Sequence, residues 1–88
     1  LGKTSEHMGT LRERGQFDLE VIYVKYIWRS NSYLCVAKDS NNNIAKFFKD
    51  TKLQVGDNIK VTAFVKDHTT GKMSGGAETY LNRVKIVE

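Results

Sequence analysis

The sequence predicts an all-β domain in which five strands close into a small barrel. Short runs of apolar and β-branched residues alternate with polar residues, and Gly, Asn and Asp clusters separate the runs. No window longer than ten residues has helical periodicity, and the chain contains no proline. Its 88 residues suit one domain, and closing the sheet would remove strand edges that promote aggregation.

The first three strands are expected at residues 17–28, 33–38 and 44–49. Phe17, Leu19 and Val21 alternate with acidic residues, whereas the run that follows Val21 is apolar on both sides. This change favours one long, bent strand that is shared by the two halves of a barrel. Residues 29–32 form a polar turn, and the Asp- and Asn-rich segment 39–43 is the strongest turn in the chain.

The last two strands are expected at residues 59–66 and 78–87. A connector, residues 50–57, precedes them and is too short for a substantial helix, with Gly56 as its positive-φ residue. Residues 68–76 form a mobile, glycine-rich loop. Leu81 and Val84 are three positions apart, so a bulge near Asn82 and Arg83 is needed for both to face the core.

Five strands in a chain of this length favour a partly open Greek-key barrel, the OB-fold, without a substantial helix between strands three and four. The long first strand followed by a hairpin favours it over an SH3-like barrel. We expect a flexible or irregular lead-in at residues 1–14 and the domain at residues 15–88. Because the chain begins with Leu1, we also expect a fragment of a larger protein.

The composition limits the classes of function and location. A net charge of +4 favours polyanionic partners without requiring them. No apolar run could span a membrane, and the polar N-terminus has no signal core, so we expect a cytoplasmic protein. Cys35 is the single cysteine, and with His7 and His68 it offers too few, too scattered ligands for a zinc site. We expect no metal and no cofactor.

Five short motifs follow one another in a fixed order. They are Gly9-x5-Gly15, Asp39-x-x-Asn42-Asn43, Leu53-x-Val55-Gly56-Asp57, Val65-Lys66-x-His68 and Thr79-x-Leu81-x-Arg83-Val84. Across about residues 9–87 the set resembles small OB-fold domains of phage and mobile-element replication proteins, which are similar to single-stranded DNA-binding domains. The chain departs from that pattern at Asn42-Asn43, where a Gly is usual, and at Phe47, where a Trp is expected.

An OB-fold binds oligonucleotides across strands two and three, with cations along the phosphates and aromatic rings stacked on bases. The candidate nucleic-acid-binding residues are Tyr26, Trp28, Arg29, Tyr33, Lys46, Phe47, Phe64, Lys66, Lys72, Arg83 and Lys85. Adjacent strand residues point to opposite faces, so one of Phe47 and Phe48 belongs to the core. We expect Phe47 to be outward, because Phe48 shares its face with the apolar Ile44.

Several of these residues have a second interpretation. Trp28 fits either a packing anchor at the rim or a stacking platform, and Arg83 could pair with an acidic residue instead of a phosphate. Tyr23 and Tyr80 suit packing better than ligand contact, and His68 suits a capping role. Cys35 is expected to be a small buried hydrophobe.

The sequence therefore predicts a non-catalytic domain that binds single-stranded DNA, in replication or recombination. No Ser-His-Asp or Cys-His arrangement supports an enzyme, and Gly71-Lys72 lacks the other residues of a phosphate-binding loop. RNA is an alternative ligand, because stacking does not read the 2′-hydroxyl group. The alternative function is a protein-interaction or structural module that contacts other domains of a larger replication protein.

Overall fold

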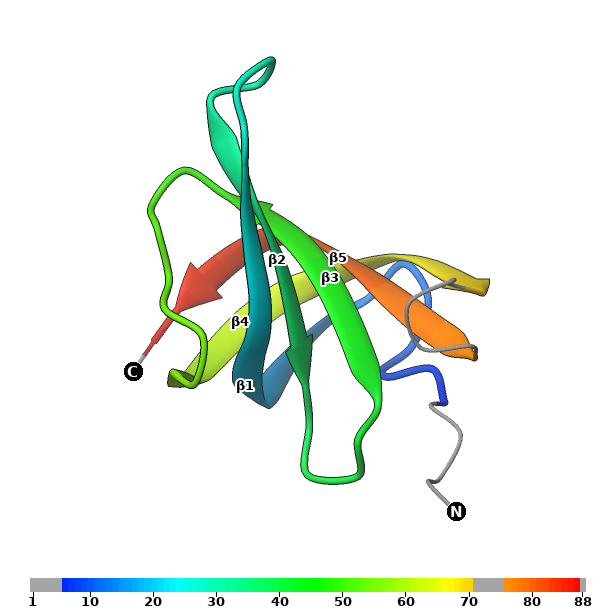
Figure 1. The fold of residues 1–88 in the computed structure, drawn as a ribbon. Coiled ribbons are helices and arrows are strands. Elements are labelled where there is room, and N and C mark those ends of the chain that lie inside the picture. The colour runs from blue at the N-terminus through cyan, green and yellow to red at the C-terminus, as the bar shows by residue number, and fades with distance from the viewer. Residues whose placement is uncertain (1–5, 71–75, 88) are drawn as a thin grey trace.

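The computed structural model describes residues 6–70 and 76–87, which form five strands and no helix. The strands are β1 (Arg14–Ile27), β2 (Ser32–Lys38), β3 (Ile44–Lys49), β4 (Asn58–Thr70) and β5 (Ala77–Ile86). They close into one barrel in the order β1-β2-β3-β5-β4 (Figure 1). The described residues contain no helix long and apolar enough to cross a membrane. The predicted all-β barrel without a helix between β3 and β4 is confirmed.

The strand order is that of an OB-fold. β1 pairs antiparallel with β2 and also with β4, so this one strand belongs to both halves of the barrel. β2 pairs antiparallel with β3, and β3 lies parallel to β5. This last pairing joins only three residues of each strand, so the barrel is least tightly hydrogen-bonded between β3 and β5.

A bulge bends β1 where it passes from one half of the barrel to the other. The first part of the strand, up to Glu20, pairs with β4, and the part from Glu20 onward pairs with β2. The register shifts between Val21 and Tyr23, which inserts Ile22 as an extra residue. The long, bent first strand predicted from the broken alternation is confirmed.

A second bulge lies in β5 at the predicted position. Lys85 pairs with Thr62 and Asn82 pairs with Phe64, so Arg83 and Val84 together oppose a single residue. Arg83 adopts a positive φ of 51° there. Leu81 and Val84 are both buried as a result, with 1% and 7% of their surfaces exposed.

The connector between β3 and β4 contains no helix and is attached to the barrel by one side chain and one turn. Leu53 packs against the core cluster. Gly56, with φ 97°, donates from its N–H to the Val21 carbonyl, and the Val21 N–H donates to the Asp57 carbonyl. These two bonds, at 2.7 and 2.8 Å, attach the connector to the bulge of β1. The positive φ predicted for Gly56 is confirmed.

Residues 6–13 form no helix or strand, yet they pack closely on the barrel. Met8 is 5% exposed and belongs to the core. The Arg12 N–H donates to the Val65 carbonyl, and the Val65 N–H donates to the Glu13 carbonyl. At Gly9 a Cβ would lie 2.9 Å from Val65 Cγ2, and its φ is 67°, so only glycine fits there.

β4 is longer than predicted. Its expected end at Lys66 is wrong, because residues 67–70 continue to pair with residues 77–80 of β5. The polar composition of this segment suggested a loop, but backbone hydrogen bonds to the neighbouring strand hold it extended. The glycine-rich part of the expected loop, with Lys72, lies outside the described residues.

Candidate nucleic-acid interface

The exposed aromatic side chains of the described residues gather on one part of the barrel. Tyr23, Tyr26, Trp28 and Phe48 have 38, 47, 75 and 46% of their surfaces exposed. They come from the second half of β1, the β1–β2 turn and β3, and β2 lies between β1 and β3 in the sheet. We call the outer surface of the second half of β1, β2 and β3, together with the β1–β2 turn and the part of β5 that pairs with β3, the aromatic face. Tyr26 does not belong to it, because it pairs with Tyr33, which packs against the core, and so points to the inner side of the sheet. The other aromatic residues are half-buried or buried.

The strand register explains which side chains reach this face. Val24, Cys35 and Phe47 lie opposite one another in β1, β2 and β3, and the last two are fully buried in the core. The next row along the strands must therefore point outward, because side chains alternate between the two faces of a sheet. That row is Lys25, Leu34 and Phe48.

The prediction that Phe47 faces outward is wrong. Phe47 is completely buried, and Phe48 is the exposed ring. The prediction relied on Ile44 as an inward residue, but Ile44 is only half-buried. The inward positions of β3 are instead Ala45 and Phe47, since the core of so small a barrel has room for a small residue beside a large one.

Phe48 forms one wall of a shallow apolar groove. The groove, of about 330 Å³, is lined by Leu34, Lys46, Phe48, Thr69 and Tyr80. Phe48 and Tyr80 meet edge to face, with their ring centroids 6.4 Å apart. They are far apart in the sequence and meet because β3 lies parallel to β5. The groove therefore brings together two aromatic rings from strands that are distant in the sequence.

Lys46, expected to contact phosphate, is held in this groove by an acidic partner. Its Nζ lies 2.8 Å from Oε1 of Glu78, whose side chain is 1% exposed, whereas the Lys46 side chain is 32% exposed. Lys46 pairs with Tyr80 across the parallel strands. This ion pair offsets the positive charge of Lys46. In the neighbouring row, Lys25 is exposed and forms no ion pair with the described residues.

The β1–β2 hairpin projects from one end of the barrel and carries four more predicted residues (Figure 1). Trp28 lies in its turn, with the Arg29 guanidinium carbon 5.8 Å from the centre of the indole ring. Tyr26 and Tyr33 pair across the hairpin, and their rings are 5.2 Å apart and tilted. The Tyr26 hydroxyl donates to Asn31 Oδ1 at 2.7 Å, which fixes the direction of this ring.

The remaining predicted residues lie on another side of the barrel. Lys66, Arg83 and Lys85 are exposed and Phe64 is half-buried, all of them on β4 and β5. We call the outer surface of β4 as far as Lys66, β5 beyond Tyr80 and the first half of β1 the basic face. Arg14 of β1 belongs to it and donates to the carbonyl oxygens of Thr62 and Arg83. The structure thus divides the predicted site between two faces.

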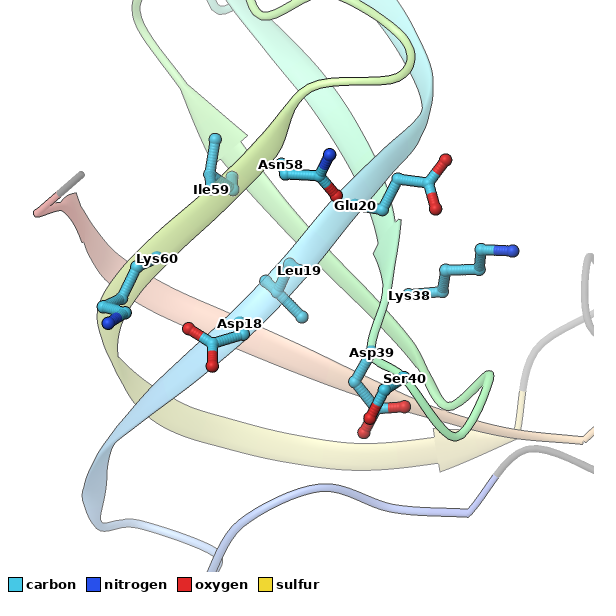
Figure 2. A pocket seen from close by; sticks show the side chains of 9 residues that line it. All are labelled: Asp18, Leu19, Glu20, Lys38, Asp39, Ser40, Asn58, Ile59 and Lys60. Atoms are coloured by element: carbon cyan, nitrogen blue, oxygen red, sulfur yellow. The ribbon is translucent and has the colours of Figure 1, made fainter.

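A larger opening lies between β1, β2 and β4, and most of the residues that line it are polar or charged (Figure 2). Its acidic members do not converge on one point in Figure 2. Asp39 is already engaged, since its Oδ1 accepts from the backbone N–H groups of Asn41 and Asn43. Within residues 6–70 and 76–87, no three His, Cys, Asp or Glu side chains are grouped to hold a metal ion.

Cys35 lies in the core beneath the aromatic face. Its surface is fully buried, which confirms the prediction of a small buried hydrophobe. Burial raises the pKa of its thiol above the ordinary value, and the positive charge of Lys49 opposes that rise. A raised pKa disfavours the thiolate, which is the nucleophilic form.

Comparison of the chain with protein-family models, with curated proteins and with solved structures finds no match. The candidate site is therefore defined by its own geometry. The sequence prediction did not include the groove residues Leu34 and Thr69 or the neighbouring Glu78, and it set aside Phe48 and Tyr80, which also line the groove. The small residue Ala45, two positions before Phe47, was the one local signal of which β3 face is inward.

Proposed function

We propose that this domain binds single-stranded DNA without catalysis, across its aromatic face, in replication or recombination. The observation that carries the proposal is the gathering of all exposed aromatic side chains of the described residues on β1, β3 and the turn between β1 and β2. Nucleobases stack on exposed rings, at about 1–3 kcal/mol per base. The resemblance to phage and mobile-element replication domains points to the same ligand.

The hairpin and the groove give a strand two places to stack. Trp28 offers the most exposed ring, and Phe48 with Tyr80 offers a groove on the adjoining surface. Lys25 lies in the same row as Phe48, so a cation lies beside the rings and can follow the phosphates. Rings and a cation in one row suit a backbone that runs across the strands, largely without regard to sequence.

Titration with oligothymidylate tests the proposal, and Trp28, the single tryptophan, serves as the probe. Stacking should change the indole fluorescence, and affinity should fall as salt rises because phosphate contacts release counterions. Binding that is absent, or indifferent to salt, would contradict the proposal. Oligouridylate in a parallel titration separates DNA from RNA.

The alternative from the sequence is a module that binds another protein domain. Exposed rings serve that role equally well, since Trp and Tyr are enriched at protein interfaces. If oligonucleotides fail to bind, the same four rings become the candidates for a protein contact. Cross-linking or pull-down with further domains of a parent protein would then be the relevant measurement.

A further inference from the structure

A buried carboxylate lies beside the groove of the aromatic face. Thr79 points into the barrel, since it pairs with the core residue Ala45 and its hydroxyl accepts from the Met8 N–H. Its neighbour Glu78 must point outward, toward the same side as Lys46 and Tyr80. Glu78 is nevertheless completely buried. The outer surface of β5 thus holds an acidic group beneath the side chains that line the groove.

This carboxylate has hydrogen-bonding capacity that the described residues do not use. Oε1 lies 2.8 Å from Lys46 Nζ in the ion pair, and neither oxygen receives an aligned hydrogen bond from the described part of the chain. A buried carboxylate with open lone pairs is costly, and a buried ion pair seldom repays its desolvation. The arrangement is better explained if a further donor reaches the carboxylate.

The groove combines apolar ring surfaces with one cation next to this carboxylate. Leu34, Phe48 and Tyr80 supply apolar walls, and Lys46 lines the groove while its ammonium group contacts Glu78. Lys46 is the more exposed of the two partners, so its movement would open the path to Glu78. A base stacked on one of these walls would meet the ammonium donor of Lys46 along one edge, and the carboxylate of Glu78 behind it once Lys46 moves.

We propose that this groove is a base-binding subsite that prefers guanine, an inference that rests on the proposed binding of single-stranded DNA. Guanine presents two adjacent donors, N1–H and the N2 amino group, which match the two oxygens of Glu78. Its O6 accepts from the ammonium group of Lys46. Thymine offers one donor between two carbonyl oxygens, which a carboxylate repels. A base in a single strand exposes this edge for recognition.

The first test changes the ligand and leaves the protein intact. Oligothymidylates that differ at one central base, with deoxyguanosine, deoxyinosine or thymidine, are titrated against the unmodified domain. Inosine keeps N1–H and O6 but lacks the amino group, so affinity should fall in the order guanine, inosine, thymine. The guanine oligonucleotide should bind about tenfold more tightly than the thymine one. Equal affinities would overturn the subsite and leave the proposed function standing, whereas no binding would overturn both.

A second test assigns the preference to the carboxylate. Glu78→Gln should remove the preference for guanine while binding of the all-thymine oligonucleotide is kept. Glu20→Gln makes the same change at a half-buried carboxylate beside the polar opening and should leave the preference intact. Retention of the guanine preference by a folded Glu78→Gln variant would overturn the role of Glu78. If that variant does not fold, the ligand series alone decides.

Discussion

The aromatic face and the basic face present different chemistry on one small barrel. The aromatic face carries three of the four exposed rings of the described residues, Tyr23, Trp28 and Phe48, and one of its two lysines, Lys46, is bound to Glu78. The basic face carries more exposed cations, but its one ring, Phe64, is half-buried. Both faces could attract a polyanion, whereas only one offers open ring surfaces to bases. Positive charge alone therefore does not locate a single-strand site on this domain.

The aromatic face exists on β3 only if Phe48, and not Phe47, faces outward. Phe47→Ala should lower the free energy of unfolding by about 3–5 kcal/mol, because it empties a completely buried position in the core. A domain of this size has about 5–15 kcal/mol in total, so the variant should be barely folded. Phe48→Ala, one residue along, should stay close to the unmodified domain. Denaturant unfolding of both variants measures the difference.

The reverse result would break the assignment of faces. If Phe48→Ala unfolds and Phe47→Ala does not, the outward row of β3 contains Phe47, and the groove with Tyr80 does not exist as described. Equal, small losses in both variants would mean that neither ring fills the core. Either outcome would remove the argument for an aromatic face on β3.

The affinity for oligonucleotides should depend on the ring of the aromatic face, Phe48, and not on the ring of the basic face, Phe64. Phe48→Ala should weaken oligonucleotide binding by about 1–3 kcal/mol, because a stacking surface in the groove is lost. Phe64→Ala on β4 is the matched control, and its affinity should stay within about twofold, a difference too small for a lost stacking contact. Fluorescence titration with Trp28 as probe measures both. A larger loss for Phe64→Ala would move the binding site to the basic face.

The local part of the fold could be predicted from the sequence. The bulge of β1 is encoded in the break of alternation at Val21, and the bulge of β5 in the spacing of Leu81 and Val84. The positive φ of Gly56 could be predicted because a tight turn needs a residue with positive φ, and glycine adopts it most easily. Each of these features depends on neighbours within a few residues. A sequence pattern reports such features directly.

The site was predicted only in part, because it depends on contacts between distant strands. Phe48 meets Tyr80, and Lys46 meets Glu78, through the parallel pairing of β3 with β5. Nothing in the sequence of β3 or of β5 indicates that these two strands pair with each other. The face of β3 was assigned from Ile44, which is half-buried, points outward and lies opposite Glu78 of the distant strand β5. Charge and aromatic content were visible in the sequence, but their division between two faces was not.

The salt dependence of binding separates the two faces by charge. Lys25→Ala removes an exposed cation in the row of Phe48, so the slope of log affinity against log salt should fall by about 0.7, the value for one contact with a single strand. Lys85→Ala removes an exposed cation from the basic face and should leave the slope unchanged. Titrations at several salt concentrations measure both slopes. A lowered slope for Lys85→Ala would indicate that the strand wraps onto β5.

The smallest effect should appear where neither face is involved. His7 and His68 stack with ring centroids 4.4 Å apart and an interplanar angle of 7°. Each ring nitrogen Nε2 lies within hydrogen-bonding distance of a carbonyl oxygen across the contact, His7 with Thr69 at 2.9 Å and His68 with Met8 at 3.1 Å. Because the carbonyls can only accept, both rings donate from Nε2. The pair thus ties the N-terminal segment to the end of β4.

His68→Ala should lower the free energy of unfolding by about 1 kcal/mol, since it removes one hydrogen bond and one stacked contact. The affinity for oligothymidylate should not change, because this contact belongs to neither the aromatic nor the basic face. Denaturant unfolding and the Trp28 titration are made on the same preparation. A variant with unchanged stability and weaker binding would place His68 in the interface, and the boundary between the two faces would have to include the end of β4.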